Sequence, residues 1–341
     1  MPPTLYDTRT LGRVISAVAP PQPWVLQTFF ASEQTFDTAM IDFDLIKGGR
    51  KLAPFVSPAV AGRPLTHRGV VTNSFLPAYV KPKHAVDLSR PLKRRAGEQY
   101  AGVLSAGERR GAIIADILAE QMAMIHRRCI WMAWQGLRTG AVIVKGEDYP
   151  ETVVDFGRHP DLTKVLLGAA RWGESGVSPL DDLEDWALEV ADISLGAAPT
   201  VATMGTGAWK LFRKDPQVSE LLESRRGSES TAETGPTPAL GYVYKGTFGT
   251  LDIWVSTDAY EDDDGAMQRM VGEYDVVLAS PMVEGVQCFG AVMDPEANYA
   301  PLKLFPKHWM EKDPAKEWLM TQSAPLMVPS RVDACACITV R

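Results

Sequence analysis

The chain has few cysteines and no long apolar run among its 341 residues. Four cysteines are present: Cys129, Cys288, Cys335 and Cys337. Their sparse, irregular spacing argues against a disulfide framework and favours reduced, mostly buried thiols. No apolar run approaches the roughly 18 residues of a membrane span, and residues 1–4 lack the pattern of a secretory signal. We therefore expect a protein that uses no membrane and stays in the compartment where it is made.

The sequence also lacks the short motifs of common enzyme classes. It contains no phosphate-binding P-loop, no GxSxG, no HExxH and no CxxC pair. Residues 205–207 (Gly-Thr-Gly) begin like a dinucleotide loop but lack its third glycine, so a turn between a strand and a helix is the simpler interpretation. We therefore expect no catalytic residues, no cofactor and no enzymatic activity.

Candidate metal ligands are present but poorly arranged. Cys335 and Cys337 alternate as on one face of a strand, and no histidine pair lies near them in the sequence. The acidic run at 261–265 lacks the alternating acids and final glutamate of a calcium loop. A solvated hairpin tip is favoured there, with adventitious cation binding left open. The five histidines are scattered, so we predict no metal site, although any of them could be a pH-sensitive contact.

Charge also limits the function. The formal net charge is −7 and the pI is about 5.4, which disfavours sequence-wide binding to nucleic acid. A protein that contacts DNA over a broad inner surface without binding it tightly would also have a negative net charge. The main basic cluster is Arg90, Lys93, Arg94 and Arg95. Without interleaved aromatic residues, it favours a solvated or salt-bridging face over a nucleic-acid site.

The first hundred residues do not resemble a core, because prolines recur through them. Residues 24–30 form a short apolar patch, and 38–43 alternate like a strand. Residues 51–60 and 70–80 resemble two strand-like arms around a Gly/Pro tip at 61–69. Ordering about forty such residues costs on the order of 40–80 kcal/mol, which about 1,600–3,200 Å² of apolar burial would offset. A thin hairpin cannot bury that area in itself, so we expect it to lie on a partner or to remain mobile.

The rest of the chain predicts an α+β fold. Apolar residues at three- and four-residue spacing predict a long helix over 108–135 that ends at Gly136 and Gly140. A hairpin should follow at 141–144 and 152–156. Helices are also predicted over 178–195, 207–213 and 217–224, and a polar loop over 226–238. Further strands are predicted over 200–204, 242–255, 274–279, 286–292, 318–328 and 334–340.

Several short stretches carry a family resemblance through their order. They are FVSPAV at 55–60, AYVKPKH at 78–84, RRGS at 225–228, YKG at 244–246, FPKHW at 305–309 and QSAPLM at 322–327. Together they resemble the lambda-type major capsid protein family of tailed phages. The likeness covers about residues 29–327. It implies a Hong Kong-97-like capsid fold with an N-terminal arm, an extended E-loop hairpin, a spine helix in a peripheral domain, and an axial domain.

The resemblance also supplies domain boundaries. Residues 1–46 would be the N-terminal arm and 47–90 the E-loop. Residues 91–164 would form the peripheral domain with its spine helix, 165–300 the axial domain, and 301–341 a return to the peripheral domain. The expected contacts between subunits are at Phe29, Phe30, Phe55, Val56, Tyr79, Lys81, Lys83, His84, Arg94, Arg95, Arg225 and Arg226.

The function implied by the resemblance is self-assembly. Pentamers and hexamers would build an icosahedral procapsid in the host cytoplasm, with a scaffolding protein and a portal, and the shell would expand around packaged double-stranded DNA. The DNA would be contacted non-specifically, and a decoration protein could add a strand to the edge-like arms. The alternative is a cellular nanocompartment shell of the same fold that encloses a cargo enzyme. A soluble α+β enzyme is a third hypothesis, and it would need a convergent polar site.

Overall fold

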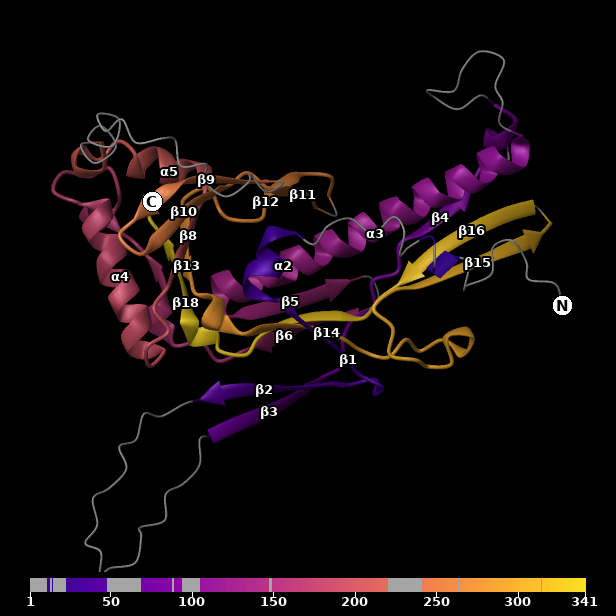
Figure 1. Cartoon of the computed structure of the whole chain (residues 1–341), viewed down its shortest axis with the longest axis horizontal. Coiled ribbons are helices and arrows are strands. Elements are labelled where there is room, and N and C mark those ends of the chain that lie inside the picture. Colours follow the sequence, from indigo (N-terminus) through magenta and orange to yellow (C-terminus); the bar gives the residue numbers. More distant parts are fainter. Residues whose placement is uncertain are drawn as a thin grey trace, which may run out of the picture.

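The structure is a computed structural model that describes residues 11–12, 14, 23–47, 69–87, 89–93, 105–146, 149–219, 241–262, 264–313 and 315–341. The subunit is elongated (Figure 1). A lobe of helices and sheet occupies one end, and one long helix runs from this lobe to the opposite end. Helices and strands are mixed along the chain, which confirms the predicted α+β class.

A six-stranded sheet forms the centre of the lobe. Its order is β7 (Thr163–Val165), β18 (Cys335–Thr339), β13 (Asp275–Ala279), β8 (Val201–Met204), β10 (Leu251–Ser256) and β9 (Tyr242–Phe248). Successive side chains point to opposite faces of a strand. Val276 and Leu278 therefore pack into one core, with α4 (Pro179–Ile193) and α5 (Thr206–Phe212), while Val277 and Ala279 pack into the other. The sheet thus separates two hydrophobic cores.

The long helix α3 (Ala106–Thr139) connects the two ends of the subunit. Its start is fixed by a capping box, in which Ser105 accepts from the Glu108 backbone and the Glu108 carboxylate accepts from the Ser105 backbone. Its end is Gly140, whose φ of 72° is a left-handed conformation that glycine adopts without strain. The helix was predicted over 108–135. It continues past Gly136, which lies inside the helix against Phe156 and Pro329.

At the far end, a three-stranded sheet lies along the first half of α3. It comprises β15 (Phe305–Lys312), β16 (Ala315–Gln322) and β4 (Lys83–Val86), in that order. Ile114 and Leu118 of the helix pack with Leu319 and Val86 of the sheet, and Leu11 joins the same small core. This core is separate from the two in the lobe.

A second three-stranded sheet covers the other half of α3. It comprises β1 (Ser32–Thr35), β14 (Gly285–Phe289) and β17 (Pro325–Pro329), with β1 parallel to β14. The predicted hairpin after α3 is confirmed as β5 (Ala141–Gly146) and β6 (Tyr149–Asp155). The acidic run at 261–265 lies at the turn of a hairpin of β11 (Ala259–Glu261) and β12 (Met267–Arg269). Residues 24–30, read from sequence only as an apolar patch, contain the helix α2 (Trp24–Phe29).

The projecting hairpin is present with a different pairing from the one predicted. β3 (Gly69–Phe75) pairs with β2 (Ile41–Lys47), so that Lys47 faces Gly69. The prediction that residues 51–60 pair with 70–80 was therefore wrong for the partner of β3. Residues 41–47 contain no proline, so each residue can donate a backbone hydrogen bond to the neighbouring strand. The expected partner, residues 51–60, contains two prolines, which cannot donate. In Figure 1 the hairpin leaves the body on the side away from α3.

The last forty residues contribute strands to both ends of the subunit. Residues 301–341 were expected to return to the peripheral domain. β15 and β16 do lie beside α3, but β18 lies between β7 and β13 in the sheet of the lobe. Its alternation explains this, because Ala336 and Ile338 fill the core under α4 and α5 while Cys335 and Cys337 face the other core. Among the residues that the structure describes, no helix is both long and apolar enough to span a membrane.

Candidate functional site

The cysteines are held in an unreactive state. Cys129, Cys288, Cys335 and Cys337 are all buried and unpaired with one another. Burial raises the pKa of Cys129, Cys288 and Cys337 to about 12, and it also raises the pKa of Cys335. A thiol with such a pKa is protonated at neutral pH and is a poor nucleophile or metal ligand. Within the described ranges, no three His, Cys, Asp or Glu side chains gather as metal ligands.

A groove of about 620 Å³ lies between β2 and the sheet of β1, β14 and β17. Its apolar lining includes Phe29, Phe43 and Val286, and its two carboxylates are Asp42 and Glu284. Asp42 accepts a hydrogen bond from Ser74, and Glu284 lies 3.8 Å from Arg331. The carboxylates are thus engaged with neighbours at the rim. The groove has the character of a packing surface between these elements.

One strand beside this groove has an open edge. Ser32–Thr35 of β1 are all exposed, and among the strands that the structure describes β1 pairs with β14 alone. An edge strand presents unpaired backbone N–H and C=O groups, which can accept a strand from another chain. The sequence did not indicate this strand, because four polar residues carry no alternation of apolar side chains.

The segment from Tyr79 to His84 is fixed by contacts within the subunit. The Tyr79 hydroxyl donates to the Ala291 carbonyl oxygen (2.6 Å) and accepts from the Met293 backbone N–H (3.2 Å). Lys81 lies over the Tyr79 ring, with its Nζ 4.8 Å from the ring centre. This anchors the chain where it leaves the hairpin and enters β4.

The next two expected contact residues lie on β4. Lys83 Nζ sits 3.9 Å from the Trp318 ring centre and 4.9 Å from that of Trp309, a cation–π arrangement on an exposed sheet face. On the opposite side of the strand, His84 Nδ1 lies 3.1 Å from Nε2 of Gln121 in α3. Lys83 is exposed and remains available to another subunit, whereas His84 is half-buried against the helix.

The other expected contact residues divide into two sets. Phe29 and Phe30 are 2% and 0% exposed in the core of the subunit itself. A contact of their side chains with another subunit would require that core to open, so their assigned role stays a prediction. The remaining six lie outside the described residues: Phe55, Val56, Arg94, Arg95, Arg225 and Arg226.

A buried polar network between α3 and the far sheet had no sequence signal. Arg110 donates from Nε (3.1 Å) and Nη2 (2.7 Å) to the Glu317 carboxylate, which also contacts His308 Nε2 at 2.8 Å. Further along the same helix and strand, Thr321 donates to the Gln121 side-chain oxygen (2.7 Å). Burial raises the pKa of Glu317, but the hydrogen bonds from Arg110 and His308 outweigh it and hold this pKa below its usual value. The network fixes the position of the far sheet on the helix.

The comparisons with known proteins agree with this architecture. A crystal structure of a prophage capsid protein from E. coli CFT073 superposes with a TM-score of 0.77, at 25% identity and over 98% of this chain and 99% of that one. The mature capsid of bacteriophage PhiM1 has a TM-score of 0.51 at 10% identity, over 94% and 87% of the two chains, and this likeness concerns the fold alone. The fold is therefore the α+β fold of phage capsid subunits of the Hong Kong-97-like type.

Sequence comparison leads to the family. The major capsid protein of Enterobacteria phage P21 is 32% identical over 95% of this chain and 96% of its own length. That of Escherichia phage lambda is 30% identical over 90% of both chains. The model of the family described as phage major capsid protein E matches residues 7–340. These relatives are phage shell proteins, so the nanocompartment alternative is not favoured. The chain belongs to the phage major capsid protein E family, the lambda-like shell-forming proteins of tailed phages.

Proposed function

We propose that copies of this chain form the pentamers and hexamers of an icosahedral shell around double-stranded DNA, and that they do so without enzymatic activity. The family is one of structural capsid proteins that assemble into shells of themselves, and the protein is a component of the virion. The observation that carries the proposal is the β2–β3 hairpin. Its base is anchored by Phe43, whose ring packs 5.8 Å from that of Phe156, and its two strands lie at the edge of the body on the side away from α3 (Figure 1).

The domain division is part of the proposal. Residues 1–46 would act as the arm, 47–90 as the E-loop, 91–164 and 301–341 as the peripheral domain, and 165–300 as the axial domain. β2 (Ile41–Lys47) and β3 (Gly69–Phe75) support a hairpin that starts slightly earlier than residue 47. The expected contact residues from Phe29 to Arg226 would then lie between subunits of the assembled shell.

The remaining partners follow from the same role. Scaffolding protein and portal would guide assembly in the host cytoplasm, and the shell would expand as non-specifically contacted DNA fills it. The open edge of β1 suits strand addition by a decoration protein. The net charge of −7 agrees with a lining that does not hold DNA tightly.

Electron microscopy of the purified chain, alone and with the protein of its neighbouring scaffold gene, tests the proposal. Closed icosahedral particles or ring-shaped capsomers are the expected result. A monomer that resists assembly under all these conditions would contradict it. The deletion of residues 61–69 should leave a folded subunit that cannot close stable shells. A Gly/Ser replacement of equal length is the matched control, because it changes the sequence of this segment and keeps its length. Native particle yield from the deletion would count against the hairpin's role.

A further inference from the structure

The outward face of α4 carries only negative charge. The helix contains six acidic residues and no lysine or arginine. Asp181, Glu184, Asp185 and Asp192 are exposed, and they share one face with Leu188, which is 66% exposed. Like charges three and four residues apart repel one another on a helix, at a small cost in stability. None of these four carboxylates has an ion pair within the described part of the chain.

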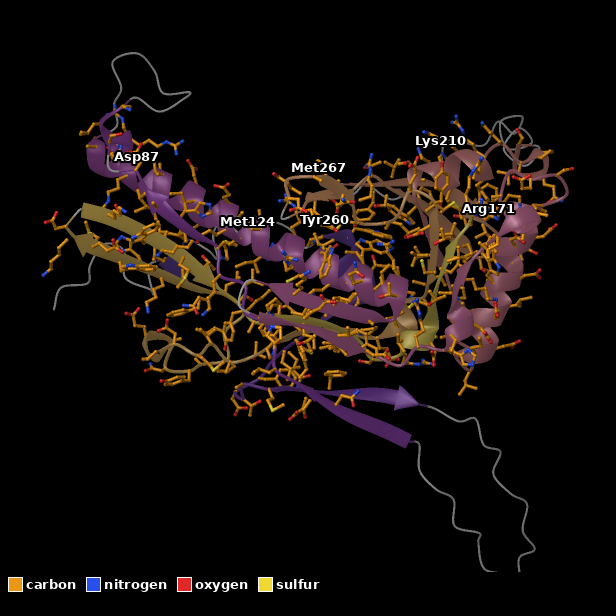
Figure 2. All side chains as sticks on the ribbon, turned by 180° about the vertical axis from the view of Figure 1, so that it is seen from behind. Asp87, Met124, Arg171, Lys210, Tyr260 and Met267 are labelled. Atoms are coloured by element: carbon orange, nitrogen blue, oxygen red, sulfur yellow. The ribbon has the colours of Figure 1, made fainter. Side chains whose placement is uncertain are left out.

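A set of opposite charge lies at α5 in the same lobe. Lys210, Arg213 and Lys214 are exposed on this helix and just after it. Lys245 of β9 joins them, because its Nζ lies 5.9 Å from the ring centre of Trp209. Figure 2 shows Lys210 on the outer side of α5. These four cations likewise have no ion pair among the described residues, in a chain whose overall charge is negative.

The two sets occupy different places on the lobe. Figure 1 places α4 along its outer end and α5 at one corner. A copy that is rotated about an axis beyond this end can bring its α4 beside the α5 of the next copy. Contacts between two different patches are head-to-tail contacts, and they close into a ring when the rotation allows it.

We propose that the acidic face of α4 in one copy docks against the basic set of α5 in the next copy, around the axis of each capsomer. This inference rests on the proposed function, because it assigns a partner surface within the pentamers and hexamers. Complementary charge steers the encounter, penalises wrong pairings and fixes the register of neighbours. Leu188, at the centre of the acidic face, supplies the apolar area that charges alone lack.

Charge reversal of each set, and then of both, tests the inference. The basic-reversed variant carries Lys210→Glu, Arg213→Glu and Lys214→Glu, and the acidic-reversed variant carries Asp181→Lys, Glu184→Lys and Asp185→Lys. Either one places like charges at every contact and should raise the concentration needed for assembly at least about tenfold. The chain with both reversals should assemble within about threefold of the native concentration. As a control for the basic-reversed variant, Lys145→Glu, Lys312→Glu and Lys316→Glu make the same change in net charge away from both helices, and should assemble normally.

A mixture of the two single-set variants tests the same charge pairing without the doubly reversed chain. In a ring of six, the two variants can alternate so that every contact joins opposite charges. In a ring of five, one contact must join like charges. The mixture should therefore give hexameric rings or tubes with few closed shells in the electron microscope.

Three results would overturn the inference. They are native assembly by either single-set variant, an equal loss in the control, and no assembly by the mixture of folded variants. A native chain that forms no particles would instead contradict the proposed function, on which the inference depends.

Discussion

Replacement of Glu317 by glutamine should loosen the far sheet from the long helix. The side chain of Glu317 is 1% exposed, and it accepts two hydrogen bonds from Arg110 and lies within hydrogen-bond distance of His308. Glutamine has the same shape but no charge. Its amide N–H₂ group, a hydrogen-bond donor, would replace one of the two carboxylate oxygens that face Arg110 and His308. Removing one partner of a buried pair costs about 3–5 kcal/mol. Arg110 is 32% exposed and can regain water, so we expect the lower limit, about 3 kcal/mol.

Thermal unfolding of the unassembled subunit measures this cost. The unfolding entropy of a chain of this length makes 3 kcal/mol equivalent to roughly 4 °C in Tm. Glu120→Gln, at an exposed position of the same helix, is the matched control and should leave Tm unchanged. A Tm for Glu317→Gln within about 1 °C of the native value would refute the assigned role of the network.

The same carboxylate gives a pH signature. Its pKa lies below the usual value because hydrogen bonds from Arg110 and His308 outweigh the effect of burial. A group whose pKa is lowered on folding contributes its full stabilisation of the folded state above its pKa in the unfolded chain, about 4.3 for glutamate. This contribution is lost as the pH falls through the pKa of the group in the folded state. The difference in stability between the native chain and Glu317→Gln should therefore be constant near pH 7 and shrink below about pH 4. A difference that grows in acid would contradict this assignment.

Three further changes probe the cores. Ile117→Asp buries an unpaired carboxylate at a site that is 9% exposed, which costs several kcal/mol, so insoluble protein is expected and unchanged solubility would mean that this face is open. Gly205→Ala places a Cβ 2.0 Å from a backbone carbonyl oxygen and should prevent folding of the lobe. Gly107→Ala is the control: its Cβ has only a contact at 3.9 Å, so the circular dichroism spectrum and the expression yield should stay unchanged. Trp134→Phe loses the 2.7 Å hydrogen bond to the Tyr242 hydroxyl and should lower the urea midpoint by an amount equivalent to about 1–2 kcal/mol; an unchanged midpoint would contradict that contribution.

Local patterns in the sequence were sufficient for the elements that depend on local order. The long helix, the hairpin after it and α4 were predicted within a few residues, because their periodicity and caps lie within single short segments. The order of the six-stranded sheet was not predictable in this way. The neighbouring strands β8 and β13 are separated by about seventy residues, and neither sequence indicates which strand it pairs with. The partner of β3 was misjudged because arms that contain proline were given the same weight as residues 41–47.

The candidate site was predictable only in part. Tyr79 and Lys83 were predicted as contact residues through the family resemblance, and this role stays a prediction. The structure shows what holds them within the subunit: the Ala291 carbonyl group for Tyr79 and the Trp318 ring for Lys83. Arg110 and Glu317 lie 207 residues apart, and each has the ordinary surroundings of a charged residue in its own segment. Their pairing depends on the packing of β16 against α3, which is a long-range result of the fold. Sequence patterns therefore identify residues within one continuous segment and miss contacts between segments that are distant in the sequence.

The separation between core and surface determines how variants should behave. The three main cores are closed by residues of one chain, with Phe29, Trp172 and Leu118 at 2% exposure or less. The edge of β1 and the charged faces of α4 and α5 are exposed and contribute little to these cores. Changes at these surfaces should therefore alter assembly at a constant Tm of the free subunit, while changes at Glu317 or Ile117 should lower that Tm. A surface charge reversal that lowers subunit Tm as much as Glu317→Gln would mean that the shell contacts and the subunit core are one cooperative unit.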